Sequence, residues 1–258
     1  MVKYVFTIAF LMLVAPVFSN TGGDVERKLV LGFKKINYWF ERQKMEPKNE
    51  LGDSLVKANQ DFQNMLLAYA KDPSTLISDF KVLEKCGVNI ATSEDGLFRI
   101  YSWDTELGGS MHVFYNVYQY KAEGKVYSRV ISDGKFEAGR WFSRIYSHHV
   151  SGKIYYLGIA HSIYSGKDSS QEIRVFNISK ATLNDKVKLI KTKAGLTNKL
   201  RVEYDFFSVY RRKERPIKLI TYDKNHETIT LPLVNDKYQV TDKFITYKFE
   251  AGYFVRIP

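Results

Sequence analysis

The spacing of the apolar residues changes about a third of the way along the chain. In the first part, apolar side chains recur every three or four residues, which is the period of an amphipathic helix. Leu29, Phe33, Ile36 and Phe40 form one such stripe, and a second runs through 55–69. The pattern predicts two helices, each with one apolar face that packs against a core.

A third helix is predicted after these two. Asp72 is a suitable N-cap, and Pro73 follows it at the first helical position, where proline is well tolerated. Gly87 is placed to end this helix. Pro47 and Gly52 are expected to interrupt the chain between the first two helices. The inner face of the third helix would contain Leu76, Ile77, Phe80 and Leu83.

Beyond the third helix the apolar pattern changes to a period of two, which is typical of β-strands. β-branched and aromatic residues dominate the short runs, and turn pairs such as Asp95-Gly96, Asp133-Gly134 and Ser151-Gly152 separate them. Tight turns join antiparallel strands, so consecutive antiparallel pairing is expected. The predicted strands are 97–103, 111–120, 126–131, 141–148, 154–163, 172–178, 186–191, 200–209, 217–222, 228–234, 244–249 and 253–257.

The predicted fold class is mainly β, an antiparallel meander with an N-terminal α-helical segment. A barrel, a sandwich or a propeller-like array would each satisfy this pattern. A weak repeat, in which Gly124, Gly152 and Gly252 each precede a strand, favours the propeller-like array.

The N-terminal residues are typical of a secretory signal peptide. Lys3 carries a positive charge, 4–18 form an uncharged and largely apolar run, and Ser19 closes a small-residue cleavage pattern. Cleavage is expected between Ser19 and Asn20. The apolar run is shorter than the about 20 residues that a membrane span needs. The sequence therefore predicts export to a periplasm or to the outside of the cell, with no transmembrane segment in the mature chain.

The chain is accordingly divided into a signal peptide (1–19), a helical segment (20–87) and an antiparallel β region (88–258). Its one cysteine, Cys86, lies in an apolar helical pattern and is interpreted as a small buried residue. An exported chain with one cysteine has no internal disulfide, so its fold depends on a hydrophobic core.

The formal net charge is +11, which favours anionic partners such as membrane lipid, acidic polysaccharide or an acidic protein. A nucleic acid partner is not expected, because it would need an extracellular source. The densest basic cluster, 211–215, precedes Pro216 and is interpreted as a solvated loop between strands. The charges are otherwise dispersed, and an aid to solubility is the alternative explanation.

Short catalytic motifs are absent from the sequence. It contains no Gly-x4-Gly-Lys-Ser/Thr loop, no His-Glu-x-x-His, no Gly-x-Ser-x-Gly and no calcium-binding loop. No cofactor is predicted. These absences count against an enzyme without excluding one, because many active sites lack a short motif.

The most unusual stretch, 101–112, joins two predicted strands. Trp103 offers a face for stacking, Asp104 and Glu106 offer carboxylates, and His112 offers an imidazole. A carboxylate beside an aromatic ring suits sugar binding, and two carboxylates suit acid–base glycoside hydrolysis.

A simpler interpretation of this stretch is a connecting turn. Asp104 would then cap the turn, Gly108 and Gly109 would supply its backbone freedom, and Trp103 would belong to the core.

The same stretch carries a resemblance. Tyr-Ser-Trp-Asp-Thr at 101–105, Gly-Gly-x-Met-His at 108–112 and Tyr-Asp-Phe-Phe-Ser at 204–208 resemble a group of uncharacterised exported bacterial proteins. The resemblance implies an exported bacterial origin. It implies no catalytic residue, because no activity comes with the group.

Histidines and serines complete the candidates for chemistry. A zinc site needs three or four convergent ligands, and the spacing of the histidines does not indicate such a set, so no metal is predicted. Any of several serines near a histidine could be a nucleophile, and nothing in the sequence selects one. The histidines are His112, His148, His149, His161 and His226, and the serines are Ser143, Ser147, Ser162 and Ser165.

The chain is therefore interpreted as an exported binding or interaction protein that contacts an anionic or carbohydrate partner, or a protein, at the envelope. Trp103, Asp104, His112 and His161 are the candidate ligand contacts. The alternative is a hydrolase that acts on an envelope or extracellular polymer and uses Asp104 or Glu106 with a histidine. Neither class is excluded at this stage.

Overall fold

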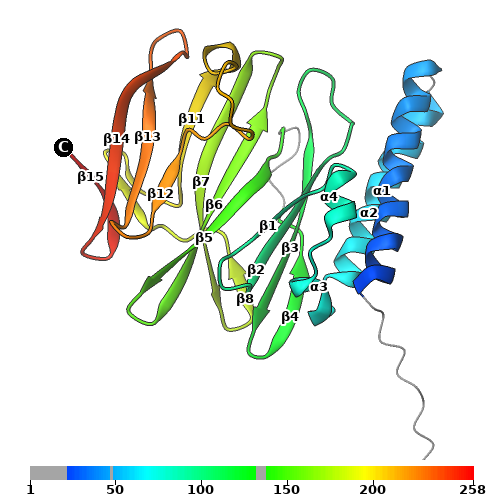
Figure 1. Ribbon diagram of the computed structural model, residues 1–258, viewed down its shortest axis with the longest axis horizontal. Coiled ribbons are helices and arrows are strands. Elements are labelled where there is room, and N and C mark those ends of the chain that lie inside the picture. The colour runs from blue at the N-terminus through cyan, green and yellow to red at the C-terminus, as the bar shows by residue number, and fades with distance from the viewer. Residues whose placement is uncertain (1–21, 47–48, 132–137) are drawn as a thin grey trace, which may run out of the picture.

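The computed structural model describes residues 22–46, 49–131 and 138–258. The predicted signal peptide, Pro47 and the Asp133-Gly134 turn lie outside these ranges. Four helices precede the strands, and they lie together at one side of the molecule (Figure 1). They are α1 (Gly22–Met45), α2 (Asn49–Tyr69), α3 (Pro73–Ile77) and α4 (Lys81–Lys85).

The two long helices form an antiparallel pair with a shared apolar face. Phe33 on α1 meets Phe62 on α2 with 5.4 Å between ring centroids, and Leu29 and Ile36 are fully buried beside them. Gly52 lies inside α2, so the expectation that it interrupts the helical region is wrong. No helix among the described residues is both long enough and apolar enough to span a membrane.

The predicted third helix is two short helices. Its start is confirmed, because the Asp72 carboxylate accepts a hydrogen bond from the Ser74 N–H at 2.9 Å. The break comes at Phe80, which has a left-handed backbone with φ of 50° and a buried ring. Arg99 of the first sheet stabilises the break by donating to the carbonyls of Thr75 at 2.7 Å and Ser78 at 2.8 Å. A side chain distant in sequence thus ends α3 early.

The strands form three sheets. The first sheet contains β1 (Asn89–Thr92), β2 (Phe98–Asp104), β3 (Phe114–Ala122) and β4 (Lys125–Arg129). The central sheet contains β5 (Trp141–Val150), β6 (Lys153–Ile163), β7 (Asp168–Ser179) and β11 (Lys199–Asp205), and β8 (Thr182–Asn184) pairs with β7. The third sheet contains β9 (Ile190–Thr192), β10 (Gly195–Thr197), β12 (Thr221–Asp223), β13 (Thr228–Val234), β14 (Val240–Glu250) and β15 (Tyr253–Ile257).

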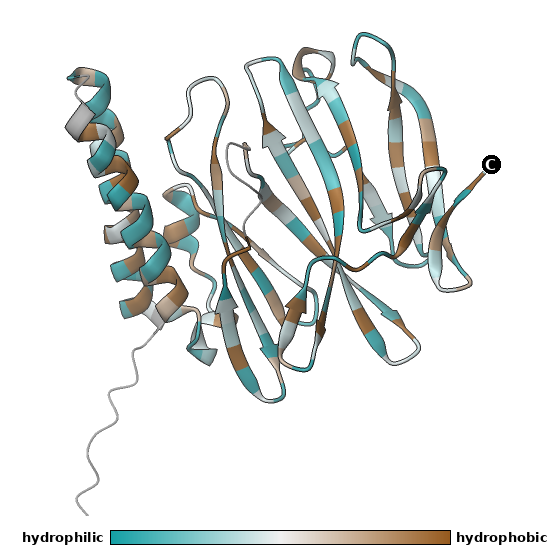
Figure 2. Ribbon diagram, turned by 180° about the vertical axis from the view of Figure 1, so that it is seen from behind, coloured by the Kyte–Doolittle hydropathy of each residue, from teal (hydrophilic) through white to brown (hydrophobic). Residues whose placement is uncertain are grey.

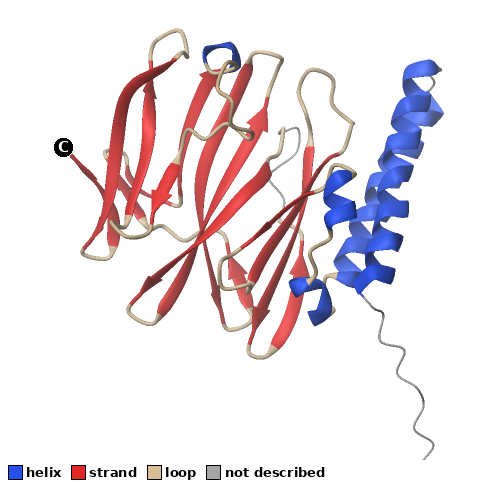
Figure 3. Cartoon of the chain, viewed as in Figure 1, coloured by secondary structure: helices blue, strands red, loops and turns tan. Residues whose placement is uncertain are grey.

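The layers follow the order helices, first sheet, central sheet, third sheet (Figures 1 and 3). Three buried apolar clusters separate them. One joins the helices to the first sheet around Phe62 and Trp103. Another joins the first and central sheets around Phe98 and Phe176. The largest lies between the central and third sheets. Brown apolar segments accordingly alternate with teal polar ones along the strands of the sheets (Figure 2).

The predicted fold class is confirmed, because the chain is mainly β with antiparallel sheets and a helical segment near its N-terminus. The predicted glycine turns are also present. Gly124, Gly152 and Gly252 all have positive φ at the tips of tight hairpins. Almost all strand pairs are antiparallel, with β15 and β9 as a parallel pair.

Several predicted strands differ from the structure. The strand predicted at 200–209 ends at Asp205 and is followed by a short 3-10 helix, Phe206–Ser208, and the one predicted at 186–191 begins only at Ile190. Two further differences have clear local reasons. Residues 111–113 belong to a loop, because the N–H of His112 donates to Ile163 on β6 and not to a ladder partner on β2. Ile217, Leu219 and Ile220 are buried, but this segment is not a strand. The side chain of Gln171 takes the place of a neighbouring strand, accepting from the N–H groups of Leu219 and Ile220.

Candidate functional site

The loop between β2 and β3 holds two of the predicted site residues as a pair. Asp104 accepts a hydrogen bond from the backbone N–H of Glu106 at 3.0 Å, which makes it the cap of the turn. Its second carboxylate oxygen contacts Nδ1 of His112. The His112 ring is stacked on Phe114, and it remains partly exposed at the edge of the loop. Asp104 therefore orients His112 toward the end of the central sheet.

Trp103 lies elsewhere and offers no surface to a ligand. Its side chain is fully buried, its indole N–H donates to Asn59 at 3.0 Å, and its ring meets Phe62 at 5.0 Å. The expectation that Trp103 is a ligand contact is corrected by this burial. The ring packs the helices on the first sheet, as the simpler interpretation of the stretch proposed.

His112 and His161 line the same cavity of about 390 Å³, beside the turn from β6 to β7. This turn is at the upper end of the central sheet in Figure 1. This volume falls in the range of small-molecule sites. The walls come from five separate parts of the chain. They contain Ser110, His112, Trp141, His161, Ser162, Ile163, Ser165, Gly166, Ser169, Tyr204, Phe206, Arg215, Pro216 and Ile217.

His161 is a fixed part of the cavity wall. Its ring stacks on Trp141 with centroids 4.3 Å apart, and burial lowers the pKa of the imidazole to about 4. Because the Gln171 carbonyl oxygen accepts two backbone N–H bonds, its amide N–H₂ faces Nδ1 of His161 at 3.3 Å. Nδ1 is therefore an acceptor, and the neutral ring carries its proton on Nε2.

This tautomer decides the role of Ser143, the candidate serine whose hydroxyl contacts the His161 ring. Its hydroxyl oxygen is 2.8 Å from Nε2 of His161. A base that activates a serine must accept the hydroxyl proton, but here Nε2–H donates to the serine. The contact is therefore a positioning hydrogen bond and not a nucleophile–base pair.

A second cavity of about 560 Å³ adjoins the first and shares two wall residues, Ser169 and Tyr204. We call the two together the upper cleft. Within the described residues, neither shared hydroxyl has a hydrogen-bond partner, although both side chains are largely buried. Burial raises the pKa of Tyr204, against the opposing charge of Arg215, so its hydroxyl stays protonated and able to donate. The second cavity is lined by Tyr164, Asp168, Ser169, Arg201, Glu203, Tyr204 and Tyr238.

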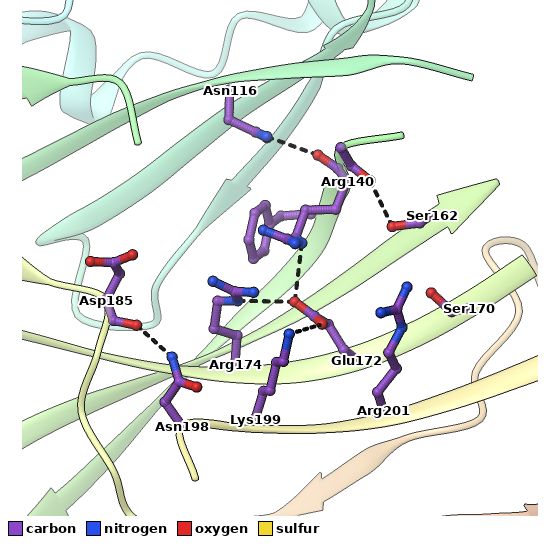
Figure 4. Close-up of polar contacts among 12 residues, drawn as sticks. Asn116, Arg140, Ser162, Ser170, Glu172, Arg174, Asp185, Asn198, Lys199 and Arg201 are labelled. Carbon is purple, nitrogen blue, oxygen red and sulfur yellow. Dashed lines mark hydrogen bonds and ion pairs between the residues drawn. The ribbon is translucent and has the colours of Figure 1, made fainter. Parts of the chain in front are cut away.

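A buried ion cluster braces the wall that carries Trp141 (Figure 4). Glu172 accepts from Arg174 at 2.9 Å and from Arg140 at 3.1 Å, and Lys199 lies 3.9 Å away. Hydrogen bonds from β3 and from β6 hold the backbone just before Trp141. Asn116 on β3 donates to the Arg140 carbonyl at 2.9 Å, and the Phe114 N–H on the same strand donates to the Ala138 carbonyl. Ser162 on β6 donates to the Gly139 carbonyl at 2.7 Å.

Most wall residues were not among the sequence candidates, and the large side chains in this group are Trp141, Tyr204, Phe206 and Arg215. Tyr204 and Phe206 belong to the Tyr-Asp-Phe-Phe-Ser motif, which was a usable signal. Arg215 belongs to the basic cluster interpreted as a solvated loop. Its guanidinium donates to carbonyls of its own loop, including Tyr210 at 2.9 Å, and the same loop closes one side of the cavity.

The carboxylates proposed for hydrolysis do not share a cavity wall. Glu106 lines a different hollow, beside Lys44 of α1, and burial together with the charge of Asp104 raises its pKa. A different pair, Asp168 and Glu203, lines the second cavity of the upper cleft. The acid–base assignment to Asp104 and Glu106 therefore has no common site to act on in the described cavities.

The remaining histidines are dispersed. His148 is buried against the third sheet and its neighbour His149 is exposed, as expected for consecutive strand residues. His148 pairs across the hairpin with Tyr155, whereas His161 pairs with Trp141 near the other end. In the ranges that the structure describes, no three His, Cys, Asp or Glu side chains converge as metal ligands.

The geometry can be set beside known proteins. No protein-family model matches the sequence, and a comparison with curated proteins gave no match either.

Proposed function

We propose that this chain is an exported binding protein that holds a carbohydrate chain in the upper cleft. Export rests on the signal-like N-terminal sequence and on the resemblance carried by 101–112 and 204–208. Carbohydrate as the ligand rests on the chemistry of the cleft walls.

The observation that carries the proposal is the wall shared by the two cavities. Tyr204 and Ser169 present hydroxyls that have no partner among the described residues. Their side chains are largely buried, but the two hydroxyls are not among the enclosed unpaired atoms, so they face the cavity. Water can complete such hydroxyls, and a ligand that displaces the water must supply matching hydrogen bonds. A sugar, with several hydroxyls that both donate and accept, is suited to do so.

The aromatic rings around this wall supply the second half of a sugar site. Trp141 and Phe206 border the first cavity, and Tyr164 and Tyr238 border the second. The apolar C–H face of a pyranose ring packs well on such rings, which combine large contact area with few rotatable bonds. Two adjoining cavities favour a chain of more than one sugar over a single monosaccharide.

A binding screen tests the proposal directly. The purified chain would be applied to an array of neutral and acidic glycans at low and at near-physiological salt. Retention at the higher salt is expected, because hydrogen bonds and ring packing are screened far less than surface charge. Binding that disappears at the higher salt, or no binding to any glycan, contradicts the proposal.

The matched variants are Tyr204→Phe and Tyr146→Phe. One neutral hydrogen bond contributes about 1 kcal/mol, so Tyr204→Phe should weaken glycan binding about fivefold. Tyr146 lies on β5 outside the cleft, and its hydroxyl also has no partner among the described residues. Tyr146→Phe should therefore leave affinity unchanged. Equal glycan affinities for wild type and Tyr204→Phe would show that the shared wall is not part of the binding site.

The hydrolase alternative keeps one observation in its favour, the pair Asp168 and Glu203 on the wall of the second cavity. The two lie on the neighbouring strands β7 and β11, where Glu203 is opposite Ser170. If the cleft cleaves its ligand, Glu203→Gln should abolish release of reducing ends while Asp104→Asn should not. Binding without any such release, in wild type, supports the binding protein.

A further inference from the structure

A second groove lies at the other end of the central sheet, about 26 Å from the upper cleft. Lys153 begins β6 and His161 lies near its other end, eight residues away at about 3.3 Å per residue. The groove has a volume of about 770 Å³. We call it the lysine groove, and its walls contain Leu97, Lys121, Ala122, Glu123, Gly152, Lys153, Ile154, Tyr155, Tyr156, Asn177, Ile178, Ser179, Lys180, Asn184, Lys186, Val187 and Lys188.

The groove concentrates positive charge that the protein itself does not neutralise. Five lysines line it against one acidic residue, Glu123. All five lysines are exposed, and none has an ion pair with another described residue. Lys44, Lys57 and Lys224, in contrast, each lie within 3.2 Å of a carboxylate oxygen. A concave surface with a single sign of charge concentrates counter-ions of the opposite sign.

Rigid hairpin tips hold these lysines in place. The β3–β4, β5–β6 and β7–β8 hairpins all turn at the lower end of Figure 1. Each uses a two-residue turn in which both residues have positive φ, namely 123–124, 151–152 and 180–181. Such turns match the twist of the strands and leave the tips little freedom. The backbone positions of Lys121, Lys153 and Lys180 are thus fixed at or beside three adjacent tips.

The groove also offers neutral hydrogen-bonding groups between the charges. Among the described residues, the Tyr155 hydroxyl, the side-chain carbonyl of Asn177 and the side-chain N–H₂ of Asn184 have no partner. Donors and acceptors spaced among cations suit a polymer that alternates hydroxyls with acidic groups. The cations are lysines without arginine, so they act as point charges and lack the planar fork that pairs with carboxylate and phosphate alike. They therefore attract an anionic chain by its charge.

We propose that the lysine groove binds an acidic polysaccharide chain. A concave groove suits a linear chain better than a flat membrane surface, which would meet only the hairpin tips. Single-stranded nucleic acid needs a series of open aromatic faces, but of the two tyrosines on the walls Tyr156 is buried and only Tyr155 is partly exposed. This site is independent of the upper cleft, and it stands or falls separately from the proposed function.

The test uses polygalacturonate as the probe, with neutral dextran, a thymidine oligonucleotide and phosphatidylglycerol vesicles for comparison. Binding of the purified chain is measured across a series of salt concentrations. Polygalacturonate is expected to bind, dextran is expected not to, and log affinity is expected to fall linearly with log salt because bound counter-ions are released. No binding of polygalacturonate at low salt overturns the proposal.

The matched variants separate the groove from net charge. The groove variant is Lys121→Gln, Lys153→Gln and Lys180→Gln. The control is Lys34→Gln, Lys35→Gln and Lys71→Gln, which removes the same charge from exposed positions on the helical side. The groove variant should lose at least tenfold in affinity and show a shallower salt dependence, whereas the control should stay within about twofold.

Three outcomes would overturn the assignment. Equal weakening by the two triple variants means that only net charge attracts the polymer. Tighter binding of the oligonucleotide or of the vesicles than of polygalacturonate, lost in the groove variant, means that the partner class is wrong. Loss of polygalacturonate binding in Tyr204→Phe means that the acidic polymer occupies the upper cleft and not the groove. Unchanged melting temperatures would establish that both triple variants are folded.

Discussion

Gln171 is the single side chain on which the geometry of the upper cleft depends most. Its fully buried amide accepts from Leu219 and Ile220 and donates to the Ile217 carbonyl at 2.7 Å. The same amide sets the tautomer of His161. One side chain therefore ties the loop that closes the cleft to the ring on which Trp141 stacks, which is why His161 acts as structure here and not as a base.

Two buried histidines make stability depend on pH, and this is a prediction at the residue scale. Burial lowers the pKa of both His148 and His161 to about 4, and the charge of His149 adds to the effect at His148. Between pH 6.5 and 4 the unfolded chain binds more protons than the folded one, so the free energy of unfolding falls as pH falls. Each histidine should contribute a loss of roughly 3 kcal/mol, complete below pH 4.

Urea unfolding at pH 7 and pH 4 measures this loss, with His148→Asn as the comparison. Asparagine can keep a hydrogen bond to Tyr222, which now lies 2.8 Å from Nδ1, but it does not titrate. Glu227 lies 3.8 Å from the same nitrogen and offsets part of the penalty if His148 is charged. In the His148→Asn variant, the fall in the free energy of unfolding between pH 7 and pH 4 that comes from the histidines should be about half of that in wild type. An identical pH dependence in both proteins would show that His148 charges freely in the fold.

At the scale of elements, the two glycines of the loop between β2 and β3 contribute unequally to its shape. A Cβ on Gly108 would lie 1.8 Å from the Met111 carbonyl oxygen, whereas a Cβ on Gly109 would meet nothing within 4 Å. Only Gly108 is therefore required for the close approach that folds the loop back. This loop delivers Ser110 and His112 to the cleft.

Gly108→Ala and Gly109→Ala form a matched pair for the loop. Gly108→Ala must displace the loop backbone, so we expect a stability loss of about 1–3 kcal/mol and weaker glycan binding. Gly109→Ala should stay within about 0.5 kcal/mol of wild type and bind normally. Thermal unfolding and glycan affinity measure both effects. If both variants bind as wild type does, the loop is a connector and His112 is not a ligand contact.

At the scale of the whole molecule, the central sheet separates two surfaces of different chemistry. The upper cleft has aromatic rings and unpaired hydroxyls at one end of the strands, and the lysine groove has uncompensated cations at the other. The separation of about 26 Å exceeds the about 8 Å Debye length at physiological ionic strength. Electrostatic effects at one end should therefore reach the other only weakly.

The two ends should respond to variants independently. Tyr204→Phe should weaken neutral glycan binding and leave polygalacturonate binding within about twofold, and the triple groove variant should do the reverse. In the combined variant the two effects should add within about 0.5 kcal/mol, as is usual for distant sites. Titration calorimetry with each ligand measures this. A larger coupling would indicate that one polymer spans both surfaces.

The local pattern along the chain was enough to determine the β-rich fold class, the positions of the two long helices and most hairpin turns. These features depend on side-chain periodicity and on backbone preferences of residues such as Asp72, Gly124 and Gly152, which act within a few positions of themselves. The same information identified His112 and His161 as residues of interest, because their chemistry is intrinsic.

Only the tertiary structure decided which residues share a cavity. Trp103 became core because Asn59, 44 positions earlier, satisfies its N–H. The third predicted helix is interrupted because Arg99 donates hydrogen bonds to the carbonyls of Thr75 and Ser78. The upper cleft gathers side chains from 110 to 238, and the lysine groove gathers three hairpins. Contacts over such separations depend on how the sheets stack, and hydrophobic periodicity does not encode that geometry.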